Sequence, residues 1–460
     1  MLPDPALSIT IPSVHDDTTL ECRIYHPRSL TASPQAPPWR KHAAVLAHPY
    51  VPLGGCFDDP VVETLAATLL RQGFLVGTFN FRGAGNSGGR TSWTSKAERS
   101  DYMSFVGFVY YYVHYLDPFP QAKPPKSLPI TPLSPTTAQP STQDASGPGP
   151  VVNPFVLLQC GYSYGAMITK LLPPLTSVLE IFAAPKSASA AADIRLRAQH
   201  LAEQQNVILS SARAALMEPA SPMSPRRGTP GLRIGGDEDK RRSQDHGGRR
   251  SFAIDAEEKV RAGVAELLKK TKKHHPHSHR KKGNPPKEND AAVDTNGEEA
   301  DKGKELDHLP SEAGLPSPIV AYLLVSPPVG WATSLMTMNL GNSVSGLFGK
   351  HHARPRSKDR EEHAQAATAT AAPAAESKQE RQKLVENPTL AIYGDSDVFV
   401  AAKRFREWAS KLQSAPGSLF RAHEVSTAGH FYVEEGTMQR LADAVRTFSG
   451  ELLAQAEDGL

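Results

Sequence analysis

The sequence is poor in several features that would fix the class of a protein at once. Cysteine occurs only 3 times in 460 residues, too few and too scattered for a disulfide framework or a zinc site. No stretch reaches the roughly 18 consecutive apolar residues of a membrane span. The first residues have neither a basic start nor an apolar run, so a secretory signal is not expected. The formal net charge is only +3, which by itself indicates no acidic partner.

The sequence is also poor in hydrophobic residues, which make up 39% of the chain against roughly 45–50% in an average globular protein. Together with 40 prolines, this composition predicts one core diluted by disordered insertions. The expected insertions are residues 118–150 (proline-rich), 217–316 (basic) and 350–383 (Ala, Lys, Arg, Glu and His). The remaining core segments are 1–117, 151–216, 317–349 and 384–460, roughly the size of a single domain.

Within these core segments, short apolar strands alternate with helical patterns. Strands are expected at residues 7–11, 19–25, 43–47, 74–79, 155–160, 319–326, 389–393 and 419–425, and helices at 61–72, 96–116, 164–172, 402–412 and 438–454, with 190–217 as a helical extension. The aromatic run at 102–116 is interpreted as a buried helix rather than a membrane segment. The fold class predicted from this order is α/β, with a mostly parallel, doubly covered sheet. The first two strands are expected to form an antiparallel edge.

One motif carries most of the chemical information. Residues 161–165 read Gly-Tyr-Ser-Tyr-Gly and follow a predicted buried strand and precede a predicted helix. The pattern G-x-S-x-G by itself is common, but this context is the one in which a nucleophilic serine is presented on a sharp turn. The helix that follows directs its N–H groups and its positive dipole end toward the reacting oxygen. The alternative is a glycine-rich turn with a bystander serine. We therefore predict Ser163 as a nucleophile.

A serine nucleophile needs a base, and the base needs an orienting acid, in the chain order Ser, Asp or Glu, His. Two carboxylates, Asp395 and Asp397, follow the predicted strand 389–393. Asp397 lies further along the loop and is the predicted acid, while Asp395 is expected to brace the turn. Of 17 histidines, His430 has the required order and position after a strand, and it is the predicted general base.

The backbone N–H groups of Tyr164 and Tyr50 are the predicted oxyanion hole. Tyr164 begins the helix after the motif, and Tyr50 lies in the loop after the third strand, where Pro49 has no N–H to donate. A nearby histidine, His48, is expected to brace this loop rather than to act as the base.

The motifs together resemble those of the α/β-hydrolase superfamily, specifically its small serine hydrolases. The matching segments are His48-Pro49 with Gly54-Gly55, the run Asn80 to Gly89, Gly161 to Ala166, Gly394 to Asp397, and Gly429 to Phe431. The resemblance covers most of the predicted core and implies Ser163, Asp397 and His430 as a catalytic triad. It also implies that residues 82–89 brace the site. No cofactor and no metal site is expected. Residues 331–347 are either a lid over an acyl pocket or a surface helix.

The basic tract at residues 269–282 is the densest charge run. It contains no Phe, Tyr or Trp to stack on bases, so nucleic-acid binding is not predicted and a solvated loop is favoured. A nuclear-localisation role and metal binding by its histidines are the alternatives. The expected location is cytoplasmic, with a nuclear location left open by this tract. The expected partners are a small-molecule acyl substrate and, through the insertions, other proteins.

Three functions are compatible with these residues. The first is a serine hydrolase that cleaves an ester, thioester or amide through an acyl-enzyme, and the complete Ser–Asp–His set favours it. The second is a catalytically silent scaffold of the same fold whose insertions bind partners. The third is an acyltransferase of the same fold, in which another nucleophile replaces water.

Overall fold

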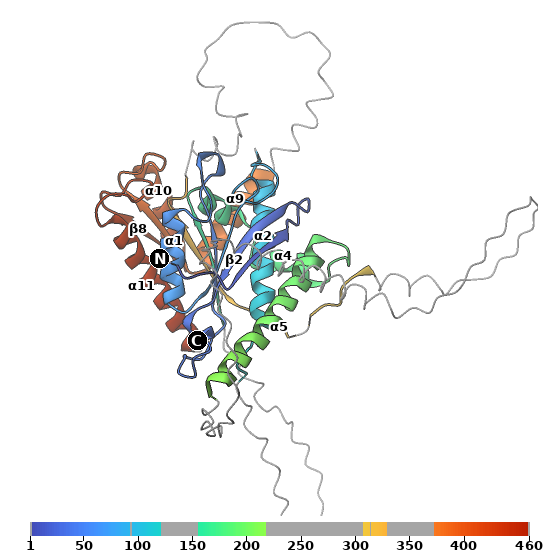
Figure 1. Cartoon of the computed structure of the whole chain (residues 1–460). Helices are drawn as coiled ribbons and strands as arrows, with labels where there is room; N and C mark the ends of the chain where they lie inside the picture. The colour runs from blue at the N-terminus through green and yellow to red at the C-terminus, as the bar shows by residue number, and fades with distance from the viewer. Residues whose placement is uncertain are drawn as a thin grey trace, which may run out of the picture.

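The computed structural model of the chain describes residues 2–92, 94–120, 155–217, 307–312, 314–328 and 372–458 (Figure 1). The described strands are β1 (Leu7–Pro12), β2 (Thr19–Tyr25), β3 (Ala43–Ala47), β4 (Leu75–Phe79), β5 (Val156–Tyr162), β6 (Ile319–Val325), β7 (Thr389–Gly394) and β8 (Phe420–Val425). The described α-helices are α1 (Pro60–Arg71), α2 (Lys96–Tyr115), α3 (Tyr164–Leu171), α4 (Leu175–Ala183), α5 (Ala190–Met217), α9 (Ala372–Glu386), α10 (Ala402–Gln413) and α11 (Thr437–Glu457).

These strands form one eight-stranded sheet in the order β1-β2-β4-β3-β5-β6-β7-β8. The β1–β2 and β2–β4 pairs are antiparallel, and every other pair is parallel. This is the α/β-hydrolase fold, and the predicted fold class, including its antiparallel N-terminal edge, is confirmed. Strand β5, which leads into the predicted nucleophile Ser163, lies in the interior of the sheet between β3 and β6, so its C-terminal end is held from both sides.

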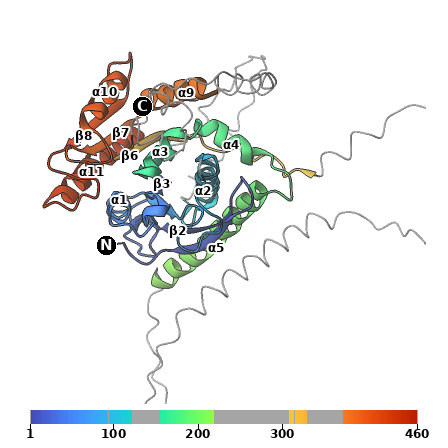
Figure 2. The ribbon, with the colours of Figure 1, turned by 90° about the horizontal axis from the view of Figure 1, so that it is seen from above.

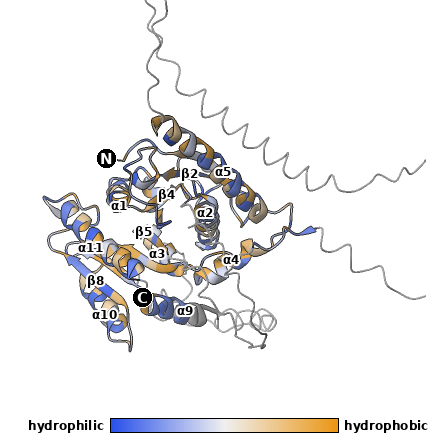
Figure 3. Ribbon diagram, turned by 90° about the horizontal axis from the view of Figure 1, so that it is seen from below, coloured by the Kyte–Doolittle hydropathy of each residue, from blue (hydrophilic) through white to orange (hydrophobic). Residues whose placement is uncertain are grey.

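Helices cover both faces of the sheet (Figure 2). Alternation along β6 shows why its sequence is apolar throughout. Leu323 packs in the cluster formed with α1 and α11, whereas Tyr322 and Leu324 pack in the cluster that contains α9 and α10. A strand buried on both faces reads as a continuous apolar run. The central elements are more hydrophobic than the outer helices. Figure 3 shows hydrophobic colours on β5 and α3 and hydrophilic stripes on α10 and α11.

Helix α2 lies in the core, as predicted for the aromatic run at residues 102–116. Its buried side chains come from all around the helix and include Tyr102, Phe105, Phe108 and Tyr112. No single helix of the described residues is long and apolar enough to cross a membrane. The pair α3 and α4 passes the same length and composition test only when taken together, across a 75° bend. Helix α3 is buried against β5 and β6.

Two predicted boundaries of the insertions are wrong. Residues 372–386 form helix α9, although residues up to 383 were assigned to an insertion. Their Ala, Lys, Glu and Gln content also favours a helix, and burial of Leu384 and Lys383 fixes it in place. The described part of 307–316 packs on the domain as well, since Arg195 contacts the Pro310 carbonyl and Glu312. Composition alone did not reveal these anchors. Helix α4 was not predicted. Residues 331–347, expected to be either a lid or a surface helix, lie outside the described residues.

Lys383 connects α9 to the C-terminal end of α3, the helix that follows Ser163. Its Nζ donates to the carbonyls of Thr169, Lys170 and Leu172 at 2.9, 3.0 and 2.7 Å. These carbonyls are at the C-terminal end of α3, where carbonyls lack intrahelical donors and a cation is favoured. Burial nevertheless lowers the pKa of Lys383 to about 7. The three hydrogen bonds from Nζ make Lys383 a buried cap for the C-terminal end of α3.

Replacing Lys383 with methionine is expected to lower the free energy of unfolding by about 2–3 kcal/mol, because buried carbonyls would lose their donor. Urea unfolding followed by circular dichroism measures the difference. The matched control is Lys378→Met, on the exposed face of the same helix, which is expected to change stability by less than about 0.5 kcal/mol. Equal stabilities of the Lys383 and Lys378 variants would contradict this account.

Candidate active site

Ser163 lies on the turn between β5 and α3. Its backbone has φ 55° and ψ −117°, a strained conformation for a non-glycine residue. The turn is held because the Ser163 N–H donates to the Val325 carbonyl at the end of β6, at 2.8 Å. Ser163 is also the residue immediately before the first turn of α3, so its hydroxyl lies at the positive end of that helix. The predicted strand–turn–helix context of the motif is present.

The two glycines of the motif are required because a side chain at either position would collide with neighbouring backbone. A Cβ on Gly161 would lie 2.3 Å from the backbone of Gly165, and a Cβ on Gly165 would lie 2.3 Å from the Ala47 carbonyl oxygen. These contacts involve backbone atoms, which cannot rotate away. Glycines two positions before and two positions after Ser163 therefore allow the turn to close against β3.

Ser163, His430 and Asp397 form a continuous hydrogen-bonded chain. The Asp397 carboxylate can only accept, so His430 Nδ1–H donates to Asp397 Oδ2 at 2.8 Å. The other ring nitrogen, Nε2, is then an acceptor for the Ser163 hydroxyl at 2.8 Å. All three residues are buried, with 3%, 6% and 6% exposure for Ser163, His430 and Asp397. The structure thus brings together three residues that lie 33 to 267 positions apart.

The two carboxylates after β7 have different environments. Asp397 is buried, and its second oxygen, Oδ1, accepts the N–H groups of Phe399 and Val400 at 2.8 and 3.0 Å. Asp395 is exposed and accepts the Ser396 hydroxyl at 2.9 Å. Asp397 therefore contacts the histidine and Asp395 stays within its turn, the arrangement expected from their positions along the loop.

The loop that carries His430 is held in place by the aromatic side chain of Tyr162. The Tyr162 hydroxyl, at the end of β5, donates to the His430 carbonyl at 2.9 Å. The Tyr162 ring lies 5.5 Å from the imidazole, and the Phe399 ring lies 4.8 Å from it on an edge-to-face contact. Sequence reasoning did not identify Tyr162 as a positioning residue. Its place directly before Ser163 was the available signal.

His48 braces the loop that carries Tyr50. Its Nδ1–H donates to the Pro49 carbonyl at 2.7 Å, and its Nε2 accepts the Phe81 N–H at 2.9 Å. Complete burial lowers the pKa of His48 to about 4, so the ring is neutral. Both nitrogens are used by the backbone, and His48 is not available as a base, as expected.

The Tyr50 ring lies 5.1 Å from the Tyr164 ring, so the two predicted oxyanion donors belong to neighbouring residues. The N–H of Tyr164 is in the first turn of α3, where N–H groups have no intrahelical acceptor. Tyr50 lines the pocket beside Ser163. Their action on an oxyanion stays a prediction.

The glycine-rich loop at residues 82–89 is built around a buried arginine. Arg82 donates to Asp101 on α2 and to Asp16, with its closest contact 2.7 Å from Asp101 Oδ1. These acids raise the pKa of the Arg82 guanidinium, against the effect of burial. The adjacent Phe81 ring packs edge-to-face on Tyr164 at 6.0 Å. The loop therefore braces the helix of Ser163.

A small pocket of about 70 Å³ opens beside the Ser163 hydroxyl. Its lining residues are Pro49, Tyr50, Leu53, Gly54, Gly55, Asp59, Ser163, Phe399, His430 and Phe431. This volume is several times below that of pockets which hold drug-sized ligands. The pocket accommodates a small group.

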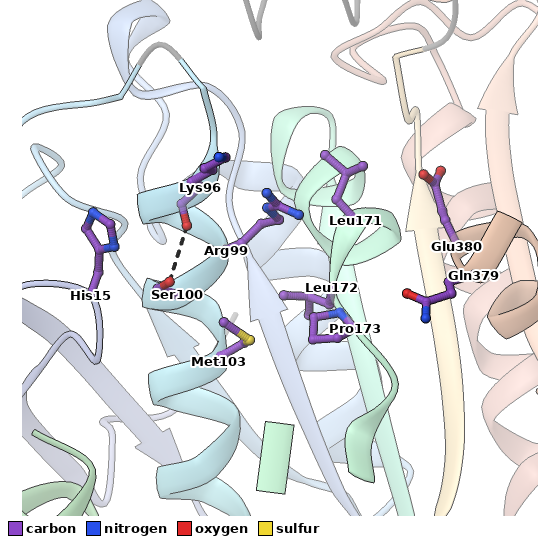
Figure 4. A pocket seen from close by; sticks show the side chains of 10 residues that line it. All are labelled: His15, Lys96, Arg99, Ser100, Met103, Leu171, Leu172, Pro173, Gln379 and Glu380. Carbon is purple, nitrogen blue, oxygen red and sulfur yellow. Dashed lines mark hydrogen bonds between the residues drawn. The ribbon is translucent and has the colours of Figure 1, made fainter. Parts of the chain in front are cut away.

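A larger cavity of about 400 Å³ lies elsewhere, between α2, the end of α3 and α9 (Figure 4). Lys96 and Arg99 line one side, and Gln379 and Glu380 line the other. Glu380 is paired with Lys170 at 2.7 Å. This cavity shares no lining residue with the pocket at Ser163. It is lined by His15 and Ser100, but the Ser100 hydroxyl donates to the Lys96 carbonyl rather than to a histidine. The smaller pocket at Ser163 therefore remains the candidate active site. Among the described residues, no group of three or more His, Cys, Asp or Glu side chains is arranged to hold a metal ion.

The fold and the hydrogen-bonded chain define an α/β-hydrolase fold with a Ser–His–Asp arrangement at the end of its central strands. No protein-family model and no curated protein matches the sequence. Among solved structures, the chain is similar to an alpha-beta serine hydrolase homologue from Coxiella burnetii, with 12% identity, a TM-score of 0.38 and coverage of 97% of this chain and 99% of that one.

Two further structures show the same level of similarity. Est1E from Butyrivibrio proteoclasticus has 10% identity and a TM-score of 0.38, with 97% of this chain and 99% of that chain covered. Esterase Pf2001 from Pyrococcus furiosus has 10% identity and a TM-score of 0.38, with coverage of 97% and 92%. Similarity this low carries no information about substrate, and the assignment of the fold rests on the strand order.

Proposed function

We propose that the protein is a serine hydrolase that cleaves an ester, thioester or amide through an acyl-enzyme intermediate. The observation that carries the proposal is the hydrogen-bonded chain from Ser163 through His430 to Asp397. A surface serine at a turn has no physical need for a buried histidine and a buried carboxylate aligned behind it. Nor does a silent scaffold need a serine on a strained turn with a histidine and a carboxylate aligned behind it.

In the proposed reaction, Ser163 Oγ attacks the carbonyl carbon while His430 Nε2 takes the hydroxyl proton. Asp397 holds the imidazole in the tautomer that leaves Nε2 free to accept, and it stabilises the imidazolium that forms. The oxyanion is assigned to the N–H groups of Tyr164 and Tyr50, each worth about 2.7–4 kcal/mol of transition-state stabilisation. His430 then gives its proton to the leaving group. Water, activated by the same histidine, releases the acyl group from Ser163.

The size of the pocket indicates a small acyl or leaving group. We therefore expect p-nitrophenyl acetate and butyrate to be cleaved with kcat/KM at least about tenfold above that of the octanoate, because a longer chain has no comparable space beside Ser163. Stopped-flow release of p-nitrophenol measures both the steady rate and a burst, which reports an acyl-enzyme. If no p-nitrophenyl ester is turned over by the full chain, the proposed reaction is wrong. Equal kcat/KM for acetate and octanoate would contradict the size argument alone.

A further inference from the structure

The loops that meet at the Ser163 pocket carry charge of one sign. Residues 48–59, 161–165, 394–401 and 426–436 contain no Lys or Arg. The carboxylates within these loops are Asp58, Asp59, Asp395, Asp397, Glu434 and Glu435. Two cations from outside these ranges contact the loops: Arg23 of β2 pairs with Asp58 and lies over the Phe57 ring, and Arg440 of α11 donates to the Thr427 hydroxyl. Neither arginine lines the pocket. Clefts lined by one sign of charge concentrate ligands of the opposite sign. The entrance to the pocket therefore favours cations.

Asp59 brings this charge into the pocket itself. Its Oδ1 accepts the Val61 N–H at 2.9 Å, which caps the start of α1 and fixes the side chain beside Ser163. Burial raises the pKa of the Asp59 carboxyl above its ordinary 3.8, while the N–H groups of Val61 and Val62 act in the opposite direction. A cation bound next to Asp59 would offset this cost of burial.

Aromatic rings surround the same space. The ring centroids of Phe399 and Phe431 lie 6.3 Å apart, and the two rings are nearly perpendicular. Both rings also contact the imidazole of His430. Tyr50 lines the pocket on the side where its ring contacts the Tyr164 ring. Phe431 is 57% exposed although it lines the pocket, so part of its ring is uncovered. A carboxylate combined with several aromatic rings is the environment that binds substituted ammonium groups, through Coulomb attraction and cation–π contacts.

We infer that the site selects esters or thioesters that carry an ammonium group close to the scissile carbonyl, with Asp59 as the residue that determines this preference. The inference rests on the proposed function. In this arrangement Asp59 and the rings of Tyr50, Phe399 and Phe431 hold the cation while the carbonyl lies against Ser163. Anionic substrates of the same shape are rejected by the carboxylates of the surrounding loops.

The test uses three thioacetates with the same two-carbon spacer between the sulfur and the end group: acetylthiocholine, 3,3-dimethylbutyl thioacetate and S-acetyl-3-mercaptopropionate. The first two are isosteric and differ only in charge, and the third carries a carboxylate. Thiol release by the full chain gives kcat/KM for each. The cationic thioester is expected to exceed the neutral one by about tenfold, and the anionic one is expected to be poorest. Asp59→Asn keeps the cap of α1 and is expected to bring the ratio of cationic to neutral kcat/KM to within about twofold of one.

Asp58→Asn is the matched control, since it removes a neighbouring carboxylate that does not line the pocket and is expected to retain the preference. Wild-type protein provides a second measurement: tetramethylammonium chloride should inhibit hydrolysis of the neutral thioester competitively, beyond the effect of sodium chloride at equal ionic strength. Turnover of the neutral thioester without a preference for the cationic one, or a preference that survives Asp59→Asn, would overturn the inference and leave the hydrolase reaction standing. No turnover of any of the three would overturn both.

Discussion

Replacing Ser163 with alanine is expected to lower kcat for p-nitrophenyl acetate by about 10⁵–10⁶-fold, to a residual rate set by binding alone. The reason is that the Ser163 hydroxyl is the one nucleophile in the pocket aligned with His430, at 2.8 Å from Nε2. Alanine removes the oxygen without adding volume on the strained turn. KM is expected to change little, because the pocket walls are unaltered. Initial rates over a range of ester concentrations separate the two constants.

Ser396→Ala is the matched control for this change. Ser396 lies on the neighbouring loop, is exposed and contacts only Asp395 through its hydroxyl among the side chains described. It is expected to retain wild-type kcat. If Ser163→Ala kept more than about a hundredth of the wild-type kcat, the nucleophile would have to be another residue.

Replacing Asp397 with asparagine is expected to lower kcat by about 10⁴-fold through the wrong tautomer of His430. Asp397 Oδ1 accepts two backbone N–H groups, from Phe399 and Val400, at 2.8 and 3.0 Å. The substituted amide must keep its oxygen toward these donors, which directs its NH₂ group at His430 Nδ1. That nitrogen then has to accept, so Nε2 carries the proton and cannot take one from Ser163.

Asp395→Asn tests the same substitution two residues earlier. Asp395 is exposed and makes no contact with His430, so its variant is expected to keep kcat within about twofold of wild type. The variant pair is therefore matched in charge and in loop. Equal losses for the two would mean that general loop charge, rather than the tautomer of His430, controls the rate.

Much of the fold follows from local patterns in the sequence. The strands and the helices flanking them were predicted because two-sided burial makes strands such as β5 and β6 continuously apolar, and because Ser163 sits between a strand and a helix. Their parallel order followed from the alternation of the two element types. The proximity of Ser163, Asp397 and His430 was anticipated for the same reason, since residues after the C-terminal ends of parallel strands meet at one edge of the sheet.

Long-range contacts account for what could not be predicted. Helix α9 has the composition of a solvated segment, and it is held by Lys383, whose acceptors lie more than 200 positions earlier in the chain. The described residues between 307 and 316 are likewise anchored by Arg195. Asp59 gave no signal as a pocket residue, because its sequence context indicates only a helix cap. Such contacts are determined by packing in three dimensions, and they leave no periodic pattern in the local sequence from which they could be predicted.

The most direct test of the proposed reaction is covalent labelling of the full chain with a fluorophosphonate. Attack by a nucleophilic serine on phosphorus expels fluoride and leaves the phosphonyl group on Oγ. The account predicts a single adduct on the peptide containing Ser163, absent in Ser163→Ala and formed much more slowly in Asp397→Asn, while Ser396→Ala and Asp395→Asn label at the wild-type rate. Intact-mass and peptide mass spectrometry identify the site. An unlabelled wild-type chain, or equal labelling of Ser163→Ala, would contradict the account.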